Sequence, residues 1–279
     1  LLQHVNLGAC QVSDIPGAIV SGMEELIELH GKTGVEETGE YLPPSVDRQV
    51  GLGFIGLANL LALEGVTYRQ FGDALEYISY SYGDLTIDPK ALKIVKALKE
   101  GIDSAASVAR MANMDRAFAI APTASCSYRY TDRAGYTTAP EIAPPIGRKV
   151  DRDSSTFGVT SYFYGPDVET AEEVGWTDYK RVVDGIMLLI TRTGLNHGYS
   201  FNTWSDVVQY SDDFIKDWLV SPQTSMYYSL QVMQNTQAKD DAMAALDGEF
   251  SSLFAEWQSD DDDILDVFND PAGCVGCAE

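Results

Sequence analysis

Two short apolar runs constrain the fold of this 279-residue chain more than any other feature of its sequence. The first spans 50–56 and is punctuated by glycines, and the second spans 117–120. Each is predicted to be a strand, and the first leads directly into a helical segment at 57–64. Longer segments with helical spacing lie around both runs. Strands and helices are therefore expected to alternate, as they do in an α/β fold.

Apolar residues recur at helical spacing in several longer segments. The first, 14–29, has Ser13 or Asp14 as its expected N-cap and Pro16 in its first turn. Asp88 is expected to open another. The helices predicted in this way span 14–29, 57–64, 69–81, 89–113, 178–193 and 211–219. The other expected features are a surface loop at 31–44, a strand near 199–202 and a loop-rich region that contains Pro140, Pro144 and Pro145.

Charge and composition exclude several classes of function. The net charge is −23, from 42 acidic and 19 basic residues, and such a chain repels a nucleic acid backbone. No apolar run approaches the roughly 20 residues that cross a bilayer, and no leader opens the sequence, so a soluble cytoplasmic protein is expected. Four cysteines form no disulfide framework, which fits a reducing compartment. Because the chain starts with Leu1 inside an apolar run, we expect an N-terminally truncated protein.

Acidic residues accumulate towards the end of the chain, with a peak at 260–263. We therefore expect two parts, a core at 1–237 and an acidic flexible tail at 238–279. Cys274 and Cys277 lie in this tail, close enough in sequence to form a disulfide and flanked by glycines, which is typical of a mobile redox shuttle. Half of a zinc site is the alternative, but the three histidines that could complete it are scattered through the core.

Small polar residues follow the run at 117–120. They are Thr123, Ala124, Ser125, Cys126 and Ser127. Consecutive small side chains leave backbone N–H groups and hydroxyls free to converge on an anion where a strand ends. One interpretation is therefore a phosphate site, and the other is a plain turn, since Ser and Thr are common in turns.

Two adjacent phenols, Tyr227 and Tyr228, stand in a stretch that favours β-structure. Tyrosine can carry a one-electron hole, so the pair is a candidate radical relay. Adjacent tyrosines also arise through packing or by chance in a chain that has 15 of them.

In combination these segments resemble the C-terminal half of the large, catalytic subunit of class I ribonucleotide reductases. The segments that carry the resemblance, in the family's order, are Asn-Leu-Gly at 6–8, Leu-Gly-Phe-Ile-Gly-Leu-Ala at 52–58, Ala-Pro-Thr-Ala-Ser-Cys-Ser at 121–127, Met-Tyr-Tyr at 226–228 and the terminal cysteine pair. Each motif is modest alone, but together they span nearly the whole chain. The resemblance implies the second half of a ten-stranded α/β barrel, followed by a flexible tail.

The resemblance also implies roles for individual residues. Those assigned to the substrate diphosphate are Thr123, Ala124, Ser125 and Cys126, with Ser127 adjacent. Tyr227 and Tyr228 would relay oxidising equivalents towards an active-site cysteine. Cys274 and Cys277 would re-reduce the active-site disulfide after each turnover and be reduced in turn by thioredoxin or glutaredoxin. The activity implied is reduction of ribonucleotides, as ribonucleoside diphosphates, to deoxyribonucleotides by a thiyl-radical mechanism.

Much of the implied enzyme lies outside this chain, which is expected to be inactive alone. The thiyl cysteine, a carboxylate base, one reducing cysteine and the ATP and dNTP effector sites would lie in a missing N-terminal half. Cys10 either takes the part of the other reducing cysteine or is a buried small residue. The chain itself is expected to bind no cofactor or metal. Its implied partners are the missing half, a metal-containing small (beta) radical subunit, and a second large subunit in a homodimer.

Two other functions remain open. A cobalamin-dependent class II reductase shares the barrel and often a terminal cysteine pair, but it needs no radical partner, so the adjacent tyrosines favour class I. The second is a non-enzymatic module in which the loop at 122–127 binds a phosphate ligand and the tail binds zinc. Stoichiometric zinc held by the tail would favour that module.

Overall fold

The computed structural model of the chain describes residues 1–33, 42–80, 86–154, 158–199, 204–206, 216, 220 and 230–232. Its central sheet has four parallel strands in the order β1-β2-β3-β6. The bounds of these strands are β1 Leu2–Asn6, β2 Gln49–Ile55, β3 Arg116–Ile120 and β6 Asn196–Tyr199. Strands that follow one another in this sheet are also neighbours in space, and helices connect them.

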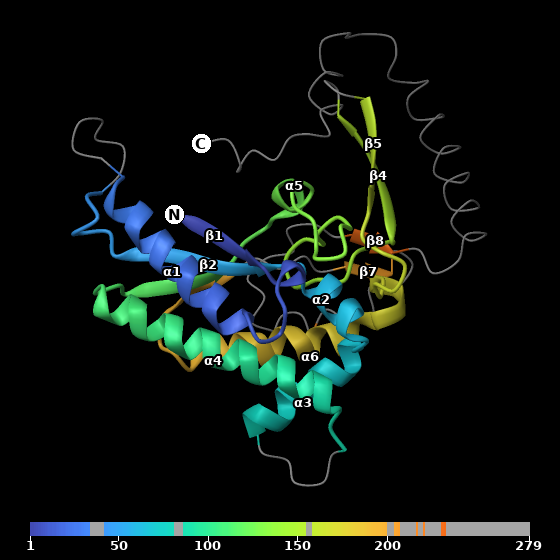
Figure 1. The fold of residues 1–279 in the computed structure, drawn as a ribbon, viewed down its shortest axis with the longest axis horizontal. Coiled ribbons are helices and arrows are strands. Elements are labelled where there is room, and N and C mark those ends of the chain that lie inside the picture. The colour runs from blue at the N-terminus through green and yellow to red at the C-terminus, as the bar shows by residue number, and fades with distance from the viewer. Residues whose placement is uncertain are drawn as a thin grey trace.

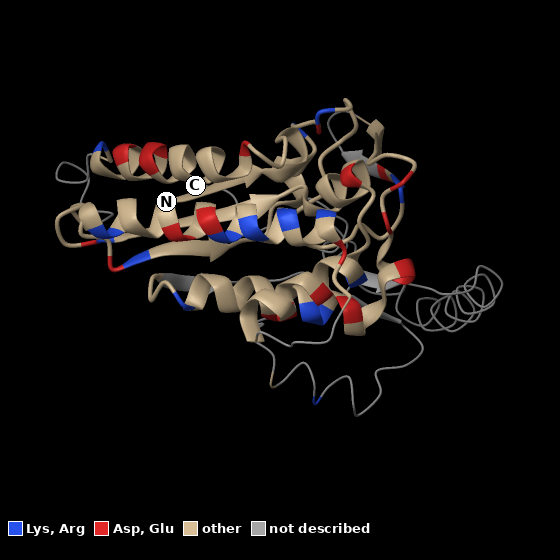
Figure 2. Ribbon diagram, turned by 60° about the horizontal axis from the view of Figure 1, so that its bottom comes forward, with Lys and Arg blue, Asp and Glu red and all other residues tan. Residues whose placement is uncertain are grey.

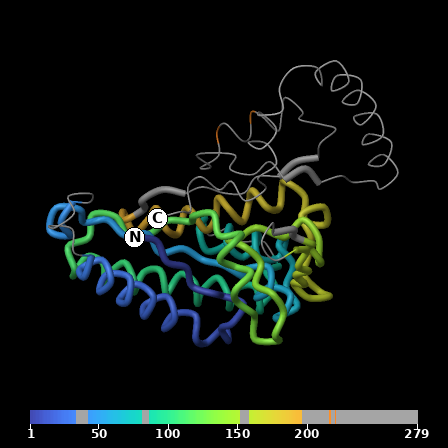
Figure 3. Tube along the Cα trace, turned by 90° about the horizontal axis from the view of Figure 1, so that it is seen from above, coloured from blue at the N-terminus to red at the C-terminus, as the bar shows by residue number. Residues whose placement is uncertain are grey.

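The connecting helices lie mainly on one side of the sheet. The bounds are α1 Ile15–Gly31, α2 Leu57–Glu64, α3 Tyr68–Tyr80, α4 Pro89–Met111 and α6 Ala171–Thr191. In Figure 1, α3, α4 and α6 lie below the sheet, while the single turn α5 (Ala124–Ser127) lies above it. Figure 2 shows α1, α4 and α6 as successive rows, and Figure 3 shows α1 and α6 along opposite flanks of the sheet. The helices thus form one layer that covers the same side of the sheet from one flank to the other.

The alternation of side chains explains why one face of the sheet takes helices. Leu52 is fully buried, and Gly22 of α1 lies against both Leu52 and Val5 of β1, because a Cβ on that glycine would be 3.1 Å from Val5 and 3.3 Å from Leu52. The large apolar residues on this helix-facing side are Val5, Val50, Leu52, Phe54, Phe118 and Ile120. Burial of these side chains anchors α1 and α4 to the sheet.

The opposite face carries small residues where strands approach closely. A Cβ on Gly51 would lie 2.7 Å from the Ala119 Cβ, and a Cβ on Gly53 would lie 2.4 Å from the Ala119 carbonyl oxygen. Real Cβ atoms do not tolerate such distances, so only glycine fits at either position. The glycine-spaced run at 50–56 is therefore explained by contacts across the sheet.

Local signals define the ends of α4. The Asp88 carboxylate accepts hydrogen bonds from the amides of Lys90 and Ala91, which caps the first turn. At the other end Asn113 has a φ of 57°, and the Met114 amide donates to the Ala109 carbonyl at 2.9 Å. This bonding is that of a Schellman motif, which stops a helix when the next residue turns left-handed.

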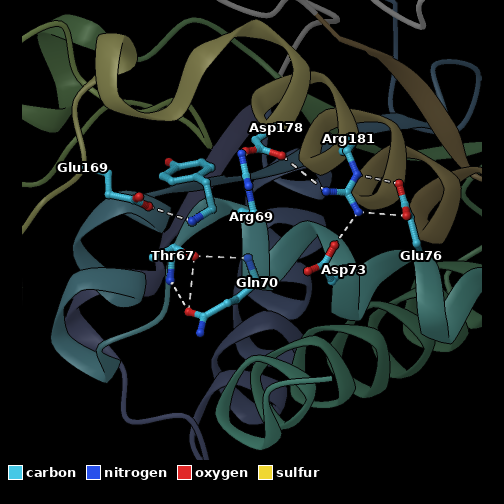
Figure 4. Close-up of polar contacts among 9 residues, drawn as sticks. Thr67, Arg69, Gln70, Asp73, Glu76, Glu169, Asp178 and Arg181 are labelled. Atoms are coloured by element: carbon cyan, nitrogen blue, oxygen red, sulfur yellow. Dashed lines mark hydrogen bonds and ion pairs between the residues drawn. The ribbon is translucent and has the colours of Figure 1, made fainter. Parts of the chain in front are cut away.

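Ion pairs join α3 to α6 (Figure 4). Arg181 of α6 donates to Glu76 at 2.7 Å and to Asp73 at 2.5 Å, and Arg69 of α3 donates to Asp178 at 2.9 Å. The hydrogen bond to Glu76 raises the pKa of Arg181 above its usual value and lowers the pKa of Glu76. The network fixes the position of α3 against α6.

Two smaller sheets accompany the central one. Strands β4 (Lys149–Ser154) and β5 (Gly158–Phe163) form an antiparallel pair that projects from the body in Figure 1. Strands β7 (Trp204–Asp206) and β8 (Leu230–Val232) pair in parallel.

The α/β prediction is confirmed, and the helices predicted at 14–29, 57–64, 69–81 and 89–113 are all present. The helix predicted at 178–193 begins earlier, at Ala171. A strand is present at Asn196–Tyr199, and residues 200–202 of the strand expected at 199–202 lie outside the described residues. The segment 211–219 lies almost wholly outside the described residues, as does the tail. In the described part of the chain the central strands form an open sheet with β1 and β6 at its edges, and no closed barrel is seen. No described helix has the length and apolarity needed to span a membrane.

Candidate functional site

The loop that follows β3 lies at the carboxyl edge of the central sheet. β3 ends at Ile120, and the chain continues through Pro122 into the single turn α5. Because the strands are parallel, the carboxyl ends of β1 and β2 lie at the same edge. Ligands of open parallel sheets bind outside the carboxyl ends of the strands. The predicted phosphate loop therefore lies where a ligand is expected to bind.

Thr123 stands at the N-cap position of α5 but does not cap it. A threonine there normally accepts a hydrogen bond from an amide of the first turn. Thr123 makes no such bond. Its hydroxyl oxygen instead accepts a hydrogen bond from the Glu141 amide at 2.9 Å, and its own amide donates to the Glu141 carboxylate at 3.2 Å. The hydroxyl and the amide of Thr123 are thus both engaged by Glu141, 18 residues further along the chain.

The other four predicted residues differ in exposure. Ser125 and Cys126 are exposed and Ala124 is partly buried, and the amide hydrogens of these three have no acceptor among the described residues. Ser127 is buried, with its amide donating to the Thr123 carbonyl at 2.8 Å and its hydroxyl to the Ala124 carbonyl at 2.9 Å. Three amides of the turn are therefore available to a ligand, whereas Thr123 and Ser127 hold its shape.

Asn59 of α2 forms a buried hub beside the loop. It is 1% exposed, and its Nδ2 lies 3.0 Å from three acceptors, the Asp132 carboxylate and the carbonyls of Thr137 and Tyr164. Its Oδ1 accepts a hydrogen bond from the Ala139 amide at 2.7 Å. One side chain thus ties α2 to the segment between α5 and α6.

The Asn-Leu-Gly segment at 6–8 also meets this hub. Asn6 donates to the Thr131 carbonyl and the Thr138 hydroxyl, each at 3.0 Å. Gly8 packs so closely that a Cβ there would lie 2.9 Å from the Asn59 Cβ. Gly56, at the end of β2, has a φ of 73°, and its amide donates to the Ala139 carbonyl at 2.8 Å. Segments separated by up to about 130 residues therefore interlock at one edge of the sheet.

A cavity of about 480 Å³ is lined by residues of β1, of α1 and of the loop that follows β3. Cys126 and Tyr130 line it from the loop side, and His4 and Asn6 line it from β1. Burial lowers the pKa of His4 to about 4, so its imidazole is neutral near pH 7. Its Nε2 is buried without a hydrogen-bond partner among the described residues.

Cys10 is partly buried next to the Asn-Leu-Gly segment. Its thiol donates to the Asn6 carbonyl at 3.4 Å, and burial raises its pKa. A thiol with a raised pKa is a poor nucleophile at neutral pH. Both roles considered for Cys10 stay predictions.

Four predicted site residues, Tyr227, Tyr228, Cys274 and Cys277, lie outside the described residues. The sequence reasoning missed two residues of the site, Asn59 and Glu141. Asn59 directly follows the segment at 52–58, and an asparagine after so apolar a run is the signal that could have identified it. Glu141 carries no comparable signal.

No protein-family model and no curated protein matches this chain. In the parts of the chain that the structure describes, no group of three or more His, Cys, Asp or Glu side chains is placed to hold a metal ion.

Proposed function

We propose that this chain is the C-terminal half of the large subunit of a class I ribonucleotide reductase, and that it acts in the reduction of ribonucleoside diphosphates. One observation carries the proposal: three of the segments that resemble this family, at 6–8, 52–58 and 121–127, lie at the carboxyl edge of one parallel sheet, where the first two also contact residues 131–139 that follow the third. Segments that resemble a family only by chance have no reason to meet.

The substrate diphosphate binds the loop through the free amides of Ala124, Ser125 and Cys126. Backbone amides in a turn are neutral donors that suit an anion. They suit this chain in particular, because its net charge of −23 makes a diffuse attraction of phosphate unfavourable. Thr123 and Ser127 were expected to bind the substrate diphosphate directly. Because their polar groups already make hydrogen bonds within the protein, their proposed role is to hold the shape of the turn.

The sheet forms part of a half-barrel. Its helices lie mainly on one face, and the other face carries Gly51, Gly53 and Ala119 packed beside Leu2 and His4 of β1. The missing N-terminal half completes the ten strands and supplies the thiyl cysteine and the carboxylate base.

The remaining residues serve electron transfer. Tyr227 and Tyr228 pass the oxidising equivalent from the small radical subunit to the active-site cysteine. Each turnover removes the 2′ hydroxyl as water and oxidises two active-site thiols to a disulfide. Cys274 and Cys277 return two electrons and two protons to that disulfide, and thioredoxin or glutaredoxin then reduces the disulfide that they form.

Turnover of the complete enzyme tests this proposal. The chain is joined to the segment encoded upstream of it, and reduction of CDP is measured with a small radical subunit, a dithiol reductant and effector nucleotides. Tyr228→Phe removes the phenol and should abolish turnover. Tyr77→Phe, a partly exposed tyrosine on α3, is the matched control and should leave turnover unchanged.

Equal turnover of the Tyr228→Phe variant and the unaltered enzyme would contradict class I radical transfer through this pair. Turnover with adenosylcobalamin in place of the radical subunit would assign the enzyme to class II. Absence of turnover together with stoichiometric zinc in the tail would favour the phosphate-binding module.

A further inference from the structure

Glu141 is a buried acidic residue that the proposed chemistry does not use. Its side chain is fully buried, and its backbone has a φ of 52°, a left-handed conformation that residues other than glycine adopt uncommonly. Non-glycine residues persist there only when their surroundings impose it.

The surroundings of Glu141 do impose it. On one side the Ala139 amide donates to Asn59, and on the other the Ile142 carbonyl accepts from the Tyr68 hydroxyl at 3.0 Å. Tyr179 of α6 is fully buried nearby, and its pKa is raised well above the usual value, first by burial and then by the charge of Glu141. Contacts from α2, α3 and α6 thus converge on the segment that presents Glu141.

Glu141 makes two hydrogen bonds with Thr123, one through its carboxylate and one through its amide. The first occupies the Thr123 amide and the second occupies the hydroxyl that would otherwise cap α5. The second bond comes from a backbone amide that other residues at 141 would also supply, so only the bond from the Thr123 amide depends on the Glu141 side chain. Together the two bonds fix Thr123 at the start of the turn that carries the amides of Ala124, Ser125 and Cys126.

We propose that Glu141 is a positioning residue, whose carboxylate holds Thr123 in place so that the loop amides are presented to the substrate diphosphate. The proposal rests on the function proposed above. Glu141 acts through Thr123 and does not contact the substrate. Its carboxylate contributes by accepting the hydrogen bond from the Thr123 amide, and its negative charge is not required.

Binding of inorganic pyrophosphate to the 279-residue chain tests the proposal, and titration calorimetry gives the affinity. Glu141→Gln keeps an acceptor for the Thr123 amide and should bind within about threefold of the unaltered chain. Glu141→Ala removes the acceptor and should bind at least about tenfold more weakly. Glu76→Ala is the matched control, since Glu76 is also paired but lies between α3 and α6, and it should leave binding unchanged.

A second pair of variants covers the case in which Glu141→Ala fails to fold. Thr123→Ser keeps the hydroxyl that accepts from Glu141, whereas Thr123→Val has the same shape without it. Thr123→Val should bind pyrophosphate about tenfold more weakly than Thr123→Ser. Hydrogen exchange of the amides at 124–126 supplies a readout without ligand, and it should change in the Glu141→Ala and Thr123→Val chains but not in the Glu76→Ala chain.

The outcomes separate this inference from the proposed function. If the unaltered chain binds pyrophosphate and both Glu141→Ala and Thr123→Val bind it equally well, the positioning role is overturned and the proposed phosphate site stands. If the unaltered chain does not bind, the proposed phosphate site fails. In that case the positioning role also fails, unless hydrogen exchange of the amides at 124–126 changes in the Glu141→Ala and Thr123→Val chains and not in the Glu76→Ala chain. Weak binding by Glu141→Gln, as weak as that of Glu141→Ala, would show that charge matters and overturn the acceptor role.

Discussion

Replacement of Asn59 by alanine should destabilise the protein more than any ordinary single substitution. The two hydrogens of the Asn59 Nδ2 are shared among three acceptors at 3.0 Å, and its Oδ1 accepts from the Ala139 amide, in a site that is 1% exposed. A buried hydrogen bond contributes about 1 kcal/mol net, and a partner left unsatisfied costs about 1–3 kcal/mol. We therefore expect a loss of about 3–5 kcal/mol from a total that is about 5–15 kcal/mol in ordinary domains.

Urea unfolding followed by circular dichroism measures this loss as a shift of the midpoint at constant slope. Asn59→Asp separates hydrogen bonding from volume, because it keeps the shape and the acceptor for the Ala139 amide but places a carboxylate beside Asp132. It should be at least as destabilising as Asn59→Ala. Gln11→Ala, an exposed amide, is the control and should change stability by less than about 0.5 kcal/mol. A loss below about 1 kcal/mol for either Asn59 variant would refute the hub.

Two further predictions follow from the sheet. Gly53→Ala places a Cβ 2.4 Å from a backbone carbonyl oxygen, so it should lower the free energy of unfolding by about 2 kcal/mol or more. The control is Gly17→Ala, whose Cβ would have no atom within 4 Å. It should be neutral or slightly stabilising in the same unfolding assay. His4 has a pKa of about 4 against 6.5 when exposed, so the unfolded chain gains a proton first as the pH falls. Stability owed to neutral His4 is complete above about pH 6.5 and should fall by about 2–3 kcal/mol towards pH 4. The His4→Gln chain should lack this component, and parallel pH curves of the two chains would contradict the assignment.

The helices with one apolar face could be predicted closely from the sequence. α2 has its predicted bounds, and α1, α3 and α4 begin and end within two residues of them. These helices bury a stripe of apolar residues at regular spacing, so the pattern in the sequence is the pattern of the contacts.

The start of α6 was missed because the helix is not continuous. Gly175 has a φ of 73° and a ψ of 160°, which interrupts the helical spacing before 178. A signal for the true start was available, since Thr170 and Glu173 form a capping box that can be read from the sequence.

Strands β4 and β5 could not be predicted from alternation. Almost every described side chain of β5 is exposed, so no face is consistently apolar. The site was harder still, because its shape depends on contacts such as Asn59 with Tyr164, which are 105 residues apart. The sequence indicated the loop at 122–127 as a candidate site, but not the residues that hold it.

The most direct test of the central claim is the affinity of the 279-residue chain for CDP and for cytidine. Ser125 is exposed on the loop, so Ser125→Asp adds a negative charge there without disturbing the core, and Ser125→Asn is its neutral match. We predict that CDP binds more tightly than cytidine, that Ser125→Asn retains this preference, and that Ser125→Asp weakens CDP binding by about tenfold, or about 1.4 kcal/mol. Equal affinity of the two variants for CDP, or no preference for CDP over cytidine, would contradict a diphosphate site in this loop.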